Sequence, residues 1–207
     1  IHDWEFAYQG MSCEHVGPMV DQGRFGNWEE TGFFINLALN VGAYEGLGYG
    51  ESLGAMIQNE GLTIPSTEEL EGCIRDRLAD EPERAAAAAD LLAIIRQFDL
   101  AAGWLSIPHG WKQYSVAAGA YRKRVPFTGH PMIGHDIIYN HPMNRCACLG
   151  RVAERDFLTF AESVSRLEGG VYISIGSAVM SPMVFEKSLS ISQNLAIQRG
   201  EHIDNHY

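Results

Sequence analysis

The stretch "GHPMIGHDIIYNHP" (129–142) holds three of the chain's eight histidines, His130, His135 and His141, together with Asp136. Imidazoles and carboxylates transfer protons near neutral pH, and they also bind zinc or iron. Spacings of five and six residues do not place the three imidazoles on one helix face, as HExxH does. We therefore interpret Asp136, His135 and His141 as candidate acid–base or substrate-binding residues. The alternatives are a metal site that includes His130, and a polar loop whose imidazoles bond the backbone.

Two further segments carry candidate binding residues. "YISIGSAVMSP" (172–182) reads as a strand that leads through Gly176 and Ser177 into a helix, where backbone amides can hold an anion. It matches neither GxGxxG nor a P-loop, and a tight turn that requires glycine is the alternative. Asp3 in "IHDWE" is a candidate at a strand end or an acid at a helix start.

Charge and composition exclude several classes of partner. The chain has 207 residues, with 15 basic and 26 acidic side chains and a net charge of −11. Nucleic acid and anionic membrane surfaces are therefore unfavourable partners. The sequence contains no run of eighteen or more uncharged apolar residues, so it predicts no membrane-spanning segment. Four scattered cysteines are typical of thiols in a reducing cytoplasm, and the basic patch around Arg122 and Arg124 reads as a solvated helix face.

Helical patterns dominate residues 27–123. Apolar residues from Phe33 to Val41 recur at helical spacing, and a glycine-rich break precedes a second helix that runs to about Ile57. "STEEL" (66–70) has the form of a capping box, and "DEPERAAAAADLLAIIRQFD" (80–99) predicts a helix. A further helix is expected at about 110–123.

Strand-like runs appear only in the second half. The runs 125–129 and 171–178 are rich in β-branched and aromatic residues and flank a predicted helix at 154–168, and another helix begins near Ser181. Strands that alternate with helices predict parallel pairing and hence a single α/β domain over residues 1–207. The helical region 27–123 is then an insertion or a packed layer. Ligands in such folds bind where strands end, which is where Asp136 and Gly176 would lie.

Three segments, in order, resemble deoxyhypusine synthase and its bacterial relatives: "IHDWEFAYQG", "AYRKRVPFTGHPMIGHDIIYNHP" and "EGGVYISIGSAVMSPMVFEKSLSISQNL". The resemblance covers about two-thirds of the chain. It implies a parallel-sheet, Rossmann-like NAD-binding fold, a homotetramer, and an amine substrate held by Asp136. It also implies that Gly176 and Ser177 lie near the cofactor and that Asp3 borders its ribose.

This sequence departs from the family's pattern at three points, and one of them is that His130-Pro131-Met132 occupies the place of the family's second aspartate. "MSPM" (180–183) replaces the family's Lys-His-His run, and its catalytic lysine has no counterpart here. We therefore expect a relative, in a chain that is part of a longer polypeptide, that binds NAD(P) and a small polar or cationic metabolite without making deoxyhypusine. A transferase or oxidoreductase activity is the corresponding expectation. The alternatives are a metal-dependent hydrolase or lyase, and a non-catalytic nucleotide-binding protein.

Overall fold

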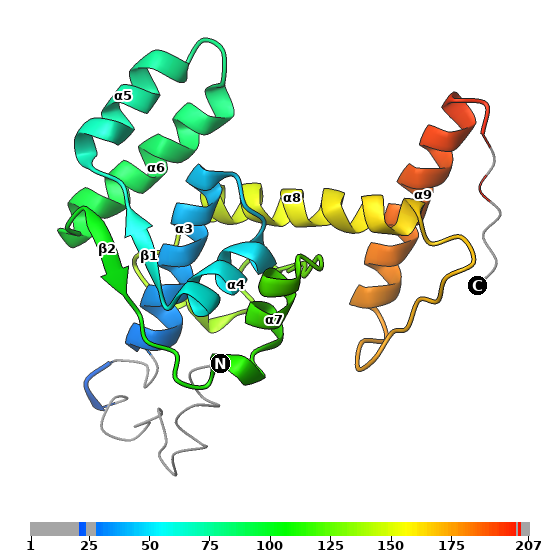
Figure 1. The fold of residues 1–207 in the computed structure, drawn as a ribbon, viewed down its shortest axis with the longest axis horizontal. Helices are drawn as coiled ribbons and strands as arrows, with labels where there is room; N and C mark the ends of the chain where they lie inside the picture. The colour runs from blue at the N-terminus through cyan, green and yellow to red at the C-terminus, as the bar shows by residue number, and fades with distance from the viewer. Residues whose placement is uncertain (1–20, 24–27, 202, 204–207) are drawn as a thin grey trace.

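The computed structural model describes residues 21–23, 28–201 and 203, and only the backbone of residues 28–30. The described chain is mostly helical, with a single pair of short strands among these residues (Figure 1). A π-helix, Trp28–Phe34, continues directly into the first long helix, α3 (Ile35–Glu45). The glycine-rich break seen in the sequence separates α3 from α4 (Tyr49–Asn59).

Two glycines explain how the chain reverses between α3 and α4. Gly46 ends α3 with φ +82°, a left-handed conformation that glycine adopts without steric cost. Gly42 lets the two helices approach closely, because a Cβ there would stand 1.9 Å from Ser52 Oγ. The two helices therefore cross at short distance and lie near the centre of the molecule in Figure 1.

A helical hairpin, α5 (Thr67–Arg77) and α6 (Pro82–Phe98), separates the two strands in sequence (Figure 1). Ser66 caps α5 by accepting a hydrogen bond from the Glu69 amide at 3.1 Å, as the capping-box pattern predicts. The strands β1 (Gly61–Ile64) and β2 (Gly103–Ser106) pair antiparallel. The helices predicted at 66–70 and 80–99 are thus confirmed.

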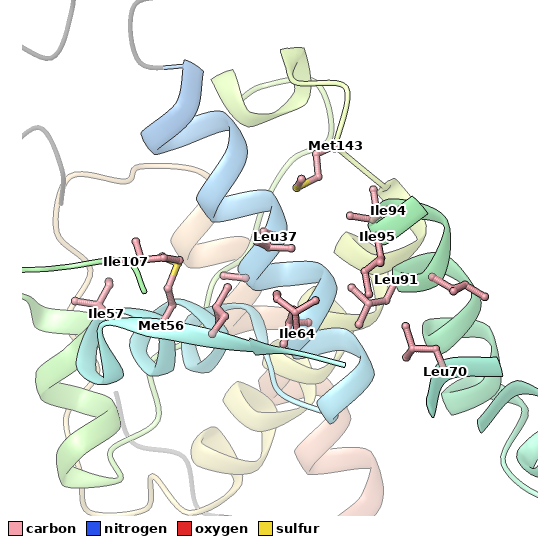
Figure 2. Packing of buried hydrophobic residues seen from close by; sticks show 14 of the residues in the cluster. Leu37, Met56, Ile57, Ile64, Leu70, Leu91, Ile94, Ile95, Ile107 and Met143 are labelled. Atoms are coloured by element: carbon pink, nitrogen blue, oxygen red, sulfur yellow. The ribbon is translucent and has the colours of Figure 1, made fainter. Parts of the chain in front are cut away.

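The main core lies between α3, α4, α6 and the strand β1 (Figure 2). Leu37, Leu91 and Ile94 are fully buried there. Burying one such side chain contributes about 1.5–3 kcal/mol, so this part of the chain holds most of the apolar stabilisation. The other large members are Met56, Ile57, Ile64, Leu70, Ile95, Ile107 and Met143.

The remaining elements lie beside this core or project from it. A 3-10 turn at Lys112–Tyr114 precedes α7 (Val116–Lys123), which packs on α4. The loop that follows includes a second 3-10 turn, Ile137–Asn140, and leads into α8 (Cys146–Ser165). Figure 1 shows α8 extending away from the core to α9 (Met180–Gln198), which packs against it.

The prediction of a parallel-sheet, Rossmann-like α/β fold is wrong for the part of the chain that the structure describes. Residues 125–129 and 171–178 form no strand; the sheet consists of β1 and β2, which lie inside the region expected to be helical. Val171, Ile173 and Ile175 do alternate along an extended segment, but their side chains are 79%, 70% and 87% exposed. Strand propensity depends on packing against neighbours, and the described residues offer this segment no strand to pair with.

No helix in the described ranges combines the length and hydropathy that crossing a lipid bilayer requires.

Candidate functional site

His141 is a buried residue of the aromatic core and is 4% exposed. Its ring stacks on Phe98 and meets the edge of Phe33, with both centroids 5.9 Å away. Its Nδ1 accepts a hydrogen bond from the Met143 amide at 3.1 Å. Burial lowers the pKa of His141, which favours the neutral ring. These contacts position the loop before α8 and leave the ring little access to a ligand.

Asp136 and His135 are both exposed on that loop. Asp136 begins the 3-10 turn, where its Oδ1 accepts a hydrogen bond from the Ile138 amide at 3.5 Å. Burial and the nearby Asp136 charge raise the pKa of Tyr49 to about 12, and the same two causes raise that of Tyr139. Asp136 is therefore a surface carboxylate beside two phenols.

The histidines of this loop do not converge on a common point. Among the described residues, no three His, Cys, Asp or Glu side chains are placed to hold a metal ion. His141 lies in the aromatic core and His135 lies in solvent, while His130 lies against Phe160 at 5.4 Å between ring centroids. The geometry therefore gives the metal-site alternative no support.

Gly176 and Ser177 precede α9 in an exposed turn, where Gly176 has φ +73°. Ser177 Oγ accepts a hydrogen bond from the Ser181 amide at 3.0 Å, so the chain itself occupies one amide that an anion would need. Asp3 lies outside the described residues. Asp136, Gly176 and Ser177 therefore share no pocket with one another that the structure describes.

Asp156 on α8 joins three segments that are far apart in sequence. It is only 3% exposed, and its Oδ2 accepts hydrogen bonds from the amides of Gly50 at 2.8 Å and Gly129 at 2.6 Å. Gly48 lies so close that a Cβ there would stand 1.8 Å from Asp156 Oδ1. The carboxylate thereby compensates the positive end of α4 and holds the loop against it. Burial raises the pKa of Asp156, and the two amides oppose that shift.

His130 adjoins this carboxylate. Burial lowers the pKa of His130, and the charge of Asp156 acts in the opposite direction. The ring Nε2 lies 3.0 Å from Thr128 Oγ1, and the tautomer decides which atom donates. The Thr128 hydroxyl and the His130 imidazole are thus within hydrogen-bond distance, near enough to Asp156 for its charge to act on the imidazole, and such a pair is able to move a proton.

Thr128 and Asp156 line a pocket of about 610 Å³ between α4, α7 and α8, which we call the α4–α8 pocket; His130 lies behind Thr128 and is not one of the lining residues. Its apolar wall includes Val125, Pro126 and Phe127, and its volume is in the range of small-molecule sites. Its charged side chains are those of Glu51, Arg122, Arg124, Arg155 and Asp156, and its uncharged polar ones are those of Gln58, Tyr121, Thr128 and Thr159.

A second pocket, the α6–α8 pocket, has a volume of about 730 Å³ and lies between the α3–α4 turn, the start of α6 and α8. Its side chains are mostly paired with each other. Arg151 lies 2.6 Å from Asp90 and 3.6 Å from Glu83, and Arg84 lies 3.7 Å from Glu81. These ion pairs connect α6 to α8, and they connect α6 to the turn that precedes α6.

Sequence reasoning missed Asp156, Thr128 and the pocket that contains them. Asp156 lies inside a charged helical stretch, "AERDF", with no pattern that marks it as buried. The available signals were the Gly48-Tyr49-Gly50 turn, which indicates a close approach, and the basic residues around Arg122 and Arg124. Comparison with known proteins finds no family model, no curated protein and no solved structure that matches this chain.

Proposed function

We propose that this chain binds a small polar metabolite in the α4–α8 pocket and acts on it by proton transfer. The observation that carries the proposal is the buried Asp156 carboxylate, which joins α4, α8 and the loop at a pocket of about 610 Å³. A rigid connection of this kind preorganises the groups that line the pocket. Binding sites of this volume typically contain a few converging polar groups, as this one does.

In the proposed chemistry, the Thr128 hydroxyl contacts the ligand. His130 exchanges a proton with that Thr128 hydroxyl, whose Oγ1 lies 3.0 Å from the His130 Nε2. A lowered pKa keeps the imidazole neutral at physiological pH, so that it can accept a proton. Asp156 acts as a positioning residue, because its Oδ2 accepts from two backbone amides rather than from a ligand-facing group. NAD(P), which the sequence resemblance implies, is the first cofactor to test, and a transferase or oxidoreductase activity would follow from it.

The test is a thermal-shift screen of NAD, NADP, nucleotides, polyamines and sugar phosphates. A ligand at 100 times its dissociation constant stabilises the protein by about 2.7 kcal/mol. Filling the pocket by Thr159→Trp, on its α8 wall, should abolish the shift. Ala153→Trp is the matched control, because Ala153 is half-buried on the same helix, as Thr159 is, but lies outside the residues that line the pocket. A ligand that stabilises both variants as it does the wild type binds elsewhere and contradicts the proposal.

A second candidate is a small organic cation at Asp136. Tyr139 supports it, because its hydroxyl is buried and has no hydrogen-bond partner among the described residues. A primary amine could donate to this hydroxyl and to Asp136 together. Spermidine should then stabilise the wild type, and Asp136→Asn should remove the effect while leaving the melting temperature within about 2 °C, since Asp136 is exposed. A large loss of stability in that variant would make Asp136 a structural residue.

Two further proposals concern assembly and compartment. The resemblance implies a homotetramer, which light scattering of the purified protein tests directly; a monomeric mass contradicts it. Cys73, Cys146 and Cys148 are free thiols, which is compatible with the cytoplasm proposed from the sequence.

A further inference from the structure

We propose that the ligand of the α4–α8 pocket carries a phosphate group, which Arg122, Arg124 and Arg155 bind. This inference rests on the proposed function, because it names the class of ligand that the same pocket takes. Guanidinium groups bind phosphate through paired, charge-assisted hydrogen bonds, so three of them at one pocket fit this chemistry.

Among the described residues, some arginines form ion pairs with carboxylates, and others do not. Carboxylates outnumber basic side chains by 26 to 15, so an arginine on the surface readily finds an acidic neighbour. Six arginines lie within 4 Å of a carboxylate, namely Arg75, Arg77, Arg84, Arg96, Arg151 and Arg166. Five described arginines form no ion pair with any residue in the described ranges, and three of them, Arg122, Arg124 and Arg155, line the α4–α8 pocket; Arg155 also lines the α6–α8 pocket. Their charges are therefore available to a ligand.

The charge of the pocket wall agrees with this reading. Three guanidinium groups face two carboxylates, those of Glu51 and Asp156. Asp156 is buried under the amides of Gly50 and Gly129, so its charge is largely compensated within the protein. Basic side chains thus outnumber acidic ones in the pocket lining of a chain whose net charge is −11, and a local excess of positive charge attracts anions.

Arg155 distinguishes a ligand site from ordinary helix stabilisation. Arg122 lies in the last turn of α7 and Arg124 is its C-cap, where a cation is favoured by the helix dipole. Arg155 lies in the interior of α8, where no such effect acts. Its side chain lines both pockets, and its guanidinium lies 3.7 Å from where a Cβ on Gly46, a residue of the α6–α8 pocket, would stand. A phosphate between α7 and α8 would be held from two different elements.

The experiment is a calorimetric titration of the full chain with inorganic pyrophosphate. Arg155→Gln and the double variant Arg122→Gln/Arg124→Gln should each weaken binding at least about tenfold, since a hydrogen bond to a charged group contributes more than the 1.4 kcal/mol that corresponds to a factor of ten. Arg199→Gln is the matched control, because Arg199 is also exposed and forms no ion pair with the described residues, but lies at the end of α9. Its affinity should equal that of the wild type.

Different failures overturn different claims. Equal pyrophosphate affinity in all four proteins, or no binding by the wild type, contradicts the phosphate inference. If the screen meanwhile finds an uncharged or cationic ligand that Thr159→Trp removes, the proposed function stands without it. If the arginine variants lose pyrophosphate but Thr159→Trp keeps it, the guanidinium groups bind the anion outside the pocket, and both claims fail.

Discussion

The two pockets that meet at α8 use the same residue types in opposite ways. In the α6–α8 pocket, the guanidinium of Arg151 lies between Asp90 and Glu83, so its charge is compensated by the protein itself. Arg155, one helical turn further along α8, lines both pockets and has no carboxylate partner among the described residues. Neighbouring arginines on one helix thus differ in their contacts: Arg151 ties α8 to α6, and Arg155 is the one that we propose binds a ligand.

The difference also lies in what shapes each pocket. Ion pairs between flexible side chains border the α6–α8 pocket, and exposed pairs of this kind contribute at most about 1 kcal/mol. Backbone contacts shape the α4–α8 pocket, where Gly48 and Gly50 lie against Asp156 and the loop carbonyl of Phe127. We therefore expect substitutions of the close-packed glycines and of Asp156 at the α4–α8 pocket to cost more stability than substitutions of the ion-paired side chains at the α6–α8 pocket.

The largest effect is expected for Gly50→Ala. A Cβ at this position would stand 1.7 Å from the carbonyl oxygen of Phe127, so the loop must move away from α4. The free energy of unfolding should fall by about 3 kcal/mol or more, as measured by urea denaturation. Gly119→Ala, inside α7 with no atom within 4 Å of the new Cβ, should instead stabilise the protein by about 0.5–1 kcal/mol. Equal effects of the two changes would contradict the close approach.

The next effect concerns Asp156. Asp156→Ala leaves the amides of Gly50 and Gly129 buried without their acceptor, and should lower the free energy of unfolding by about 2–3 kcal/mol. Asp156→Asn keeps an acceptor oxygen and should cost clearly less. Asp76→Ala removes a carboxylate that is 69% exposed and should change stability by less than about 0.5 kcal/mol. If Asp156→Ala lowers the free energy of unfolding as little as Asp76→Ala does, the Asp156 carboxylate does not hold α4 and the loop together.

The pH dependence of stability gives a smaller effect at the same pocket. Burial lowers the folded-state pKa of His109, His130 and His141 below 6.5, so the unfolded chain binds more protons than the folded one. The stability that these residues contribute is present above pH 6.5 and is lost as the pH falls below it. The slope is at most about 1.4 kcal/mol per pH unit for each proton.

Chemical denaturation between pH 5 and pH 8 measures this slope. His130→Gln should flatten the profile in the acid range, because one of the three imidazoles whose pKa is lowered by burial is then absent. His135→Gln replaces an exposed ring and should leave the profile unchanged. A steeper profile in His130→Gln would mean that the Asp156 charge outweighs burial at this position.

The sequence predicted local structure well and long-range pairing badly. The capping box at Ser66 and the alanine-rich helix after Pro82 are local signals that depend on neighbouring residues, and both predictions are confirmed. The run at 171–175 alternates as a strand does, but alternation cannot reveal whether a partner strand lies beside it. The parallel sheet was inferred from that run, and this inference is wrong for the described residues.

The candidate site shows the same limit. His141 was selected for its residue type, yet Phe33 and Phe98 enclose its ring, a contact between residues 43 and 108 positions apart. Asp156 looked like any acidic residue of an exposed helix face, because the amides that bury it come from Gly50 and Gly129. The glycine-rich turn was the one local feature that signalled a close contact, and it could not name the partner.

The central claim is that α8 carries one arginine for structure and one for binding, and a matched pair of variants tests it most directly. Arg151→Gln and Arg155→Gln are compared for their free energies of unfolding and their pyrophosphate affinities. We predict that Arg151→Gln loses about 1 kcal/mol of stability and keeps its affinity, whereas Arg155→Gln keeps its stability and loses affinity at least about tenfold. The opposite pattern, or equal losses in both variants, would contradict the account.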